Sequence, residues 1–262
     1  MKHVLNTIIF AAFIFATANS TSAQTQEEKA RNLMKKYTPT LVVLTVKGKI
    51  VTTTDGDPLP VRERQRRTLG ITIADNGLIA VSNSAIDLSV GLAGQKSRIG
   101  NKVVTIKTAK TEFTDIEISY GDSVVIHGKV VRQVVEADIA FVLPDPVETR
   151  AKNKKFKKVD LSQYGTAKSA DQVVGLSRSS SVFGYMPTLT MGRISGVFKD
   201  SQTSRTYFLN TASNSQGVPV FSLDGRPIGI TVVRIVNGRP TGILATLSAG
   251  SILVMAKLVE GY

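Results

Sequence analysis

Short apolar runs separated by tight turns constrain the fold of this chain more than any other feature. Three pairs of runs flank the turn signals Asp75-Asn76-Gly77, Gly121-Asp122 and Asp224-Gly225. Asn-Gly and Asp-Gly between apolar segments indicate β-hairpins, because these residues accept the positive φ angles of two-residue hairpin turns. Further Val-, Ile- and Leu-rich runs follow at short intervals up to residue 247. The pattern predicts an all-β barrel or sandwich.

A helix is expected at each end of this β region. Ala30, Leu33, Met34 and Tyr37 recur at helical spacing, which predicts a short amphipathic helix within residues 24–37. At the other end, a serine at 248 precedes an apolar run and can cap a terminal helix that reaches about residue 259.

A Pro- and Lys-rich stretch divides the β region into two parts. We expect a first β-barrel over residues 38–147, a basic linker over 148–158, and a second barrel with its terminal helix over 159–262. The expected architecture is therefore two packed antiparallel β-barrels.

Residues 1–23 have the pattern of a secretory signal peptide. Lys2 precedes a mostly apolar core from Val4 to Ala18, and small residues lead to Ala23 before the expected cleavage. The alternative is a retained anchor. No later segment approaches the roughly 18 apolar residues of a membrane span. The mature chain is therefore expected to be exported, either to the periplasm or as a secreted protein, without a transmembrane segment.

Composition limits the chemistry open to the chain. With no cysteine, it has no disulfide, thiolate metal site or cysteine nucleophile. Beyond residue 23 the single histidine is His127, and no Asp-x-Asp-x-Asp loop occurs. We therefore expect no metal and no cofactor. The formal net charge of +13 favours acidic partners.

The segment from Asn214 to Ile230 combines a loop, a short strand, the Asp-Gly turn and a second strand. It resembles the nucleophile loop of trypsin-fold serine proteases, where Gly-Asp/Asn-Ser-Gly-Gly-Pro/Ala leads into the same hairpin. On that motif Gln216 occupies the nucleophile position, and Asn214 and Gln216 occupy the oxyanion-hole positions. A glutamine amide is not a nucleophile, because its nitrogen lone pair is delocalised. Asparagine tolerates the left-handed backbone conformation better than most residues, so Asn214 is compatible with a partial oxyanion hole.

Two further segments match that family in the right order. In the hairpin of residues 68–87, Ser84 stands where the resemblance places the histidine base, and a serine hydroxyl is not basic near neutral pH. The segment Glu136-Ala137-Asp138-Ile139-Ala140 matches the Asp-Ile-Ala-Leu motif, so Asp138 retains the triad carboxylate. The likeness covers residues 38–260 and is strongest to the HtrA/Deg-like bacterial branch, without a PDZ domain after residue 260.

The resemblance implies an inactive pseudoprotease that binds a protein or peptide in its former active-site cleft. One alternative is an atypical serine endopeptidase that uses Ser215, one residue out of register, with a lysine base. That slip would put Gln216 where the family has glycine. His127 lies outside the expected base position, and we interpret it as a structural or surface residue.

A second alternative is a module that binds anionic polymers. The basic runs comprise Arg62, Arg64, Arg66, Arg67, Lys152, Lys154, Lys155, Lys157 and Lys158, which could grip phosphate or sulfate groups or could simply be solvated loop charge. An exported protein would meet anionic glycan or lipopolysaccharide before nucleic acid. The aromatic content of 6% also does not favour nucleic-acid stacking.

Overall fold

The structure is a computed structural model, and it describes residues 24–121, 123–236, 238–259 and 262. The expected signal peptide, residues 1–23, lies outside the described residues. Within the described part of the chain, no helix has both the length and the apolar character needed to cross a membrane.

Helix α2 (Gln26–Tyr37) opens the described chain, as the helical spacing predicted. The Thr25 hydroxyl accepts a hydrogen bond from the Glu28 N–H and caps the first turn. The apolar side of α2 is buried, and the ring of Tyr37 stacks on Phe221 at 4.3 Å between centroids. A 3-10 turn, η1 (Thr38–Thr40), then leads into the first strand.

Seven strands form the N-terminal sheet, in the order β1-β2-β3-β7-β6-β5-β4. They are β1 (Leu41–Thr54), β2 (Arg62–Thr72), β3 (Ile79–Ser82), β4 (Lys96–Ile99), β5 (Lys102–Ser119), β6 (Val125–Val134) and β7 (Ile139–Pro144). Strand β1 also pairs with β5, so the sheet curls back onto its first strand. The short helix α3 (Asn83–Ile86) follows β3, and the 3-10 turn η2 (Val135–Ala137) precedes β7.

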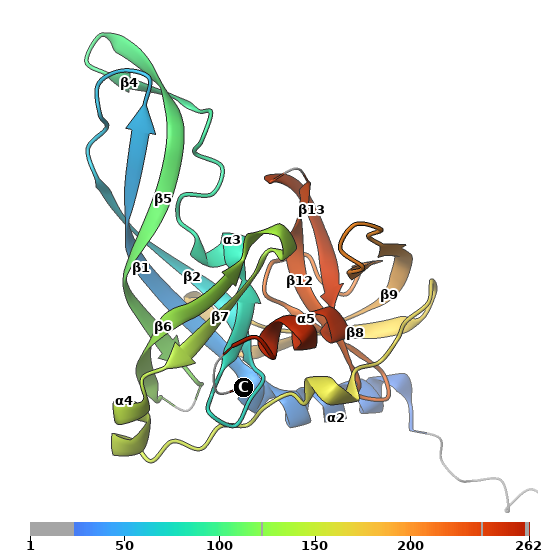
Figure 1. The fold of residues 1–262 in the computed structure, drawn as a ribbon. Helices are drawn as coiled ribbons and strands as arrows, with labels where there is room; N and C mark the ends of the chain where they lie inside the picture. Colours follow the sequence, from blue (N-terminus) through green and yellow to red (C-terminus); the bar gives the residue numbers. More distant parts are fainter. Residues whose placement is uncertain (1–23, 122, 237, 260–261) are drawn as a thin grey trace, which may run out of the picture.

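The outer halves of these strands form a protruding arm (Figure 1). We define the arm as residues 47–66 and 89–115, which include the outer parts of β1, β2 and β5 and all of β4. A largely polar sequence such as that of residues 48–67 is typical of a loop, but most of it is paired strand. The reason is that arm strands pair with one another while most of their side chains stay exposed, so the alternation typical of a half-buried strand is missing.

The second unit is a closed barrel in the order β10-β13-β12-β11-β8-β9. Its strands are β8 (Gln172–Arg178), β9 (Pro187–Lys199), β10 (Thr206–Asn210), β11 (Pro219–Ser222), β12 (Pro227–Val236) and β13 (Arg239–Ser248). Short elements connect and end the chain: α4 (Pro146–Ala151), η3 (Leu161–Gln163), η4 (Ser181–Phe183) and α5 (Ala249–Ala256). The expected linker therefore begins inside α4. Ser248 caps α5, as predicted.

One apolar core joins the two units. Ile71 and Phe141 of the N-terminal sheet belong to the same buried cluster as Phe221 and Val232 of the barrel and Tyr37 of α2. Because the units share this core, residues from both can be held in fixed positions where their edges meet. The prediction of an all-β, two-barrel fold with a helix at each end is confirmed.

Candidate functional site

Asp138 is the buried centre of the site. It follows η2 in the left-handed conformation, with φ 52°, and its side chain is only 1% exposed. Four groups donate hydrogen bonds to its carboxylate: the Ser84 N–H at 2.5 Å, the Ser82 hydroxyl at 2.7 Å, the Ser84 hydroxyl at 3.0 Å and the Val233 N–H at 2.6 Å. Two of these donors are backbone N–H groups. The other two are the side-chain hydroxyls of Ser82 and Ser84.

Burial and hydrogen bonding act in opposite directions on this carboxyl. Removal from water raises the pKa of Asp138 above its usual value, and the donors from Ser82, Ser84 and Val233 oppose that rise. Val233 belongs to β12, so Asp138 also ties the N-terminal sheet to the barrel. The carboxylate therefore has a structural task that does not depend on any catalytic one.

Ser84 occupies the first turn after β3 and is 5% exposed. Its hydroxyl turns inward to Asp138, while its carbonyl accepts a hydrogen bond from Nη1 of Arg66 at 2.9 Å. Ser84 thus touches the carboxylate that the sequence resemblance assigns to the triad. In the described structure, no hydrogen bond links it to Ser215 or Gln216.

The loop before β11 is fixed by backbone contacts on both sides. Gly217 has φ +79°, and its N–H donates to the Thr231 carbonyl at 2.8 Å. A Cβ added at Gly217 would come within 2.2 Å of the Leu69 carbonyl oxygen. Only glycine fits this position, because the backbone is left-handed and β2 lies directly against it. Asn214 does not adopt a positive φ, so the left-handed conformation that asparagine tolerates is not used here.

A cleft of about 380 Å³ opens where the two units meet. Arg66, Arg67 and Ala85 line it from the N-terminal sheet, and Arg178, Tyr185, Ser215 and Gln216 line it from the barrel. The structure therefore brings Ser215 and Gln216 to the same cavity as two of the predicted anion-binding arginines. Ala85, the neighbour of Ser84, reaches the cleft, whereas the Ser84 hydroxyl faces Asp138.

No general base contacts Ser215 in the described residues. Its carbonyl accepts from the Ser213 hydroxyl at 3.2 Å, and no hydrogen bond of its own hydroxyl is present among the described residues. The cations of the cleft lining are arginines, and a guanidinium group does not act as a general base. No lysine belongs to that lining. His127 lies on β6, outside the cleft lining.

The fold has clear relatives among solved structures. The MamO protease domain from Magnetospirillum magneticum superposes with a TM-score of 0.52 at 14% identity, over 84% of this chain and 97% of that domain. The chain has the trypsin-like protease fold. Deg5 gives a TM-score of 0.56 at 16% identity, over 87% of this chain and 92% of Deg5. Both likenesses support the HtrA-like form of the trypsin-like fold, and at such identities they carry no residue's role. No protein-family model and no curated protein matches the sequence.

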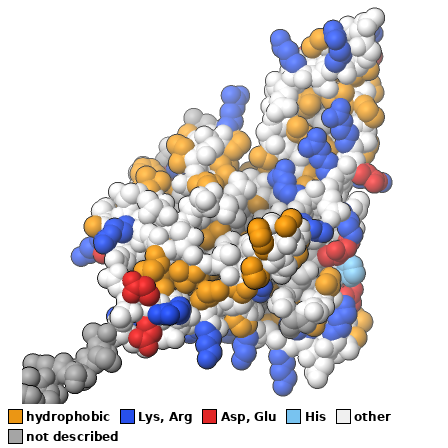
Figure 2. Space-filling view, turned by 180° about the vertical axis from the view of Figure 1, so that it is seen from behind, with side chains coloured by type: hydrophobic (Ala, Val, Ile, Leu, Met, Phe, Trp, Pro, Cys, Tyr) orange, Lys and Arg blue, Asp and Glu red, His pale blue; other side chains and the backbone are white. Residues whose placement is uncertain are grey.

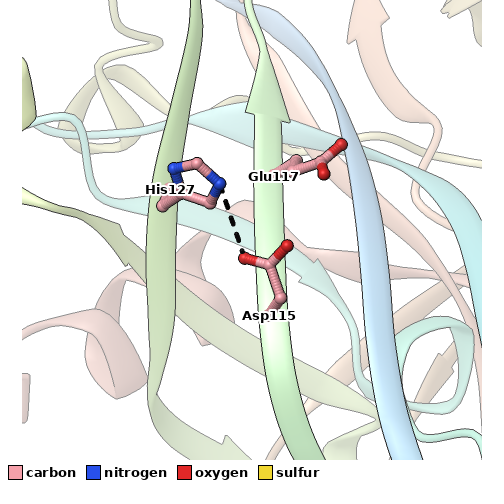
Figure 3. A group of neighbouring side chains, drawn as sticks. All are labelled: Asp115, Glu117 and His127. Carbon is pink, nitrogen blue, oxygen red and sulfur yellow. Dashed lines mark ion pairs between the residues drawn. The ribbon is translucent and has the colours of Figure 1, made fainter.

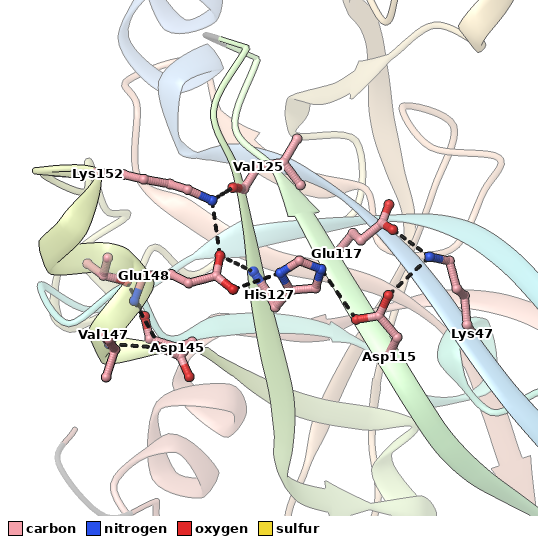
Figure 4. A network of polar contacts seen from close by, with 10 residues as sticks. Lys47, Asp115, Glu117, Val125, His127, Asp145, Val147, Glu148 and Lys152 are labelled. Atoms are coloured by element: carbon pink, nitrogen blue, oxygen red, sulfur yellow. Dashed lines mark hydrogen bonds and ion pairs between the residues drawn. The ribbon is translucent and has the colours of Figure 1, made fainter.

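A second polar cluster of this trypsin-like protein lies on the outer face of the N-terminal sheet. Asp115 and Glu117 of β5 and His127 of β6 each offer a ligand atom, all within 4.8 Å of one another (Figure 3). The Lys47 ammonium donates to Asp115 at 3.0 Å and to Glu117 at 2.5 Å, and Nδ1 of His127 lies 2.8 Å from Glu148 (Figure 4). The Lys47 ammonium already binds both carboxylates, so a metal would have to displace it. The cluster is an ion-pair network.

The predicted anion-binding residues separate into different places. Of the lysine run, Lys152 pairs with Glu148 at 3.0 Å, Lys158 pairs with Asp75 at 2.6 Å, and Lys154 lies 4.7 Å from the centroid of the Tyr120 ring. Lys155 and Lys157 are exposed. Of the arginine run, Arg62 and Arg64 lie on the arm beside a second hollow, and Arg66 and Arg67 reach the cleft.

On the barrel side of the cleft, Ser215 and Gln216 were predicted from the sequence, whereas Arg178 and Tyr185 were not. Arg178 ends β8, and its guanidinium donates to the carbonyls of Thr38, Leu41 and Tyr185, so it anchors three segments at once. Tyr185 has φ 56°, which is unusual for a bulky residue. An arginine at a strand end and a tyrosine in a Gly-Tyr pair carry no signal in sequence that distinguishes them from surface residues.

Proposed function

We propose that this protein is a trypsin-like pseudoprotease, which holds a protein or peptide segment in its cleft without hydrolysing it. One observation carries the proposal: the Ser84 hydroxyl bonds to Asp138 at 3.0 Å, where a working triad needs an imidazole. A serine hydroxyl can satisfy a buried carboxylate, but it cannot take a proton from a nucleophile at neutral pH.

The loss of kcat expected without a nucleophile and a base is large enough to favour binding over turnover as the function. Removing the nucleophile or the base of a serine protease lowers kcat by about 10⁶-fold. With Ser84 and Gln216, this chain lacks both groups at the positions that the resemblance assigns. Ser215 could supply a hydroxyl, but the cleft lining offers it no base. We therefore expect no useful peptidase activity.

Exposed apolar side chains beside the cleft support a binding role. The loop that carries Tyr185 also carries Val182, Phe183 and Met186, which are 85%, 63% and 56% exposed. Apolar side chains gathered on the rim of a polar cavity are typical of protein-interaction sites. We also propose export of the chain, on the pattern of residues 1–23, so that the partner would be met outside the cytoplasm.

Selection from a displayed heptapeptide library tests both parts of the proposal. Residues 24–262 are immobilised, and retained peptides are sequenced and examined by mass spectrometry. We expect retention of intact peptides, reduced in a Tyr185→Ala variant. Cleaved peptides that disappear with Ser215→Ala would refute the inactive site and support the serine endopeptidase alternative. Absence of any retained peptide would refute binding in the cleft.

A second candidate function rests on the arm. Its cations include Arg62, Arg64, Lys96 and Arg98, for which no salt bridge exists within the described residues, and blue side chains are spread along the arm in Figure 2. We propose this surface for anionic glycan or lipopolysaccharide. Heparin retention that weakens with salt and falls in Arg62→Gln/Arg64→Gln is expected. Retention that falls instead in Lys155→Gln/Lys157→Gln would reject the arm as the site.

A further inference from the structure

The cleft between the two units is a concentrated positive site. Three arginines, at 66, 67 and 178, belong to its lining, together with serines at 177, 179, 180 and 215. No Asp or Glu belongs to that lining. All of these side chains can donate hydrogen bonds, and the guanidinium groups add charge that no neighbouring carboxylate in the cleft cancels.

Two of the three arginines, Arg66 and Arg67, have N–H groups that make no hydrogen bond within the described residues. Nη1 of Arg66 donates to the carbonyls of Ser84 at 2.9 Å and Asp87 at 3.5 Å, which holds the side chain in place. Its Nε and Nη2 have no hydrogen-bond partner in the described part of the chain. The Arg67 guanidinium makes no hydrogen bond there, and its carbon lies 6.0 Å from the centroid of the Tyr185 ring. The Arg178 guanidinium, in contrast, donates hydrogen bonds to backbone carbonyls of Leu41 and Tyr185.

The opposite wall of the cleft is held in a strained conformation. Tyr185 has φ 56°, and the Arg178 guanidinium fixes its carbonyl at 3.2 Å. A left-handed tyrosine costs free energy, and such residues gather at ligand clamps, where the surrounding structure enforces them. Here the constraint places the tyrosine beside Arg67, so ring and guanidinium form one preorganised surface.

We propose that the cleft selects acidic peptide segments, whose carboxylates bind the free N–H groups of Arg66 and Arg67. This inference rests on the proposed function, because it names the class of peptide for the same cleft. A guanidinium fork matches a carboxylate through two parallel N–H···O bonds, and both arginines have N–H groups left to donate. The Ser215 hydroxyl lines the same cavity and adds a neutral donor. An acidic side chain within an extended peptide satisfies these groups.

Fluorescence polarisation with positional-scanning heptapeptide pools tests the proposal. Pools with Asp or Glu fixed at one position are compared with pools that carry Asn or Gln there. The Kd of the acidic pools should be lower by roughly tenfold or more, the size expected for charge-assisted hydrogen bonds. The preference should vanish in Arg66→Gln/Arg67→Gln. It should shrink in Arg67→Gln alone, which removes a single ring contact within the described structure and should leave the fold intact.

The matched control is Lys155→Gln/Lys157→Gln, which removes the same charge from exposed residues outside both the cleft and the arm. It should leave the acidic preference unchanged. Equal loss in both double variants would overturn the inference, since it would reflect net charge alone. Pools that bind without any acidic preference would overturn the inference and leave the proposed function standing. Pools that never bind would overturn both.

Discussion

At the scale of single residues, the central feature is the buried carboxylate of Asp138, which hydrogen bonds from Ser82, Ser84 and Val233 hold in place. Asp138 is predictable from its sequence motif, and so is the serine at 84. The four donors around Asp138 are not predictable, because Ser82 and Val233 lie 56 and 95 residues away along the chain. Those contacts give Asp138 a role in stability that is independent of turnover.

Asp138→Asn should lower the free energy of unfolding by about 2 kcal/mol or more. An amide group cannot accept on both sides, so at least one donor among Ser84, Ser82 and Val233 would face an N–H₂ group in a buried site. Urea unfolding measures the loss. Asp57→Asn is the control, because that exposed residue pairs with Lys102 at 3.2 Å and should change stability by less than about 1 kcal/mol. Equal effects would contradict the structural role of Asp138.

At the scale of elements, hairpins and helix caps were predictable and the arm was not. The Asp-Gly turn before β12 and the cap at Ser248 are local signals, and the structure has both. Strand β2 begins with the run from Arg62 to Arg67, whose charge suggests a loop. It is a strand because β1 supplies its backbone partners, in register from Leu41 to Ile50. Strands whose side chains are exposed on both faces show no alternation of apolar and polar residues, so their pairing cannot be recognised in the sequence.

The loop before β11 should depend on glycine at 217. Gly217→Ala should cost more than about 2 kcal/mol, because it combines left-handed strain with a clash against the Leu69 carbonyl. Gly242 is the matched control: its φ is +75°, but nothing lies within 4 Å of an added Cβ. Gly242→Ala should therefore show the strain alone, about 1 kcal/mol. Equal losses in urea unfolding would show that β2 does not press on this loop.

Helix α4 is tied to β6 through Glu148, and its titration reports that contact. Hydrogen bonds from Lys152 and His127 lower the pKa of Glu148 to about 2. A depressed carboxyl pKa adds stability above the unfolded value near 4.5, and this contribution is lost as pH falls through about 2. Carboxyl NMR titration should show Lys152→Ala raising the pKa more than His127→Ala. An unperturbed pKa in the unaltered protein would contradict the network in Figure 4.

At the scale of the whole molecule, the two units are fused by a shared core and meet at a cleft. The chain order of the three protease-like segments made the fold predictable. The basic character of the cleft was not predictable as such, because Arg66, Arg67 and Tyr185 come together only when both units pack. Sequence placed the arginines in a single anion-binding run, and the structure divides that run between arm and cleft.

Fluorophosphonate labelling is the most direct test of the inactive site, because the probe reacts only with an activated serine. It is applied to residues 24–262, to Ser215→Ala, and to the double variant Ser84→His/Gln216→Ser. We predict no labelling of the unaltered protein and labelling of the double variant, in which Asp138 would have an imidazole to orient. Labelling of the unaltered protein that disappears in Ser215→Ala would contradict this prediction, since the cleft would then hold a working nucleophile.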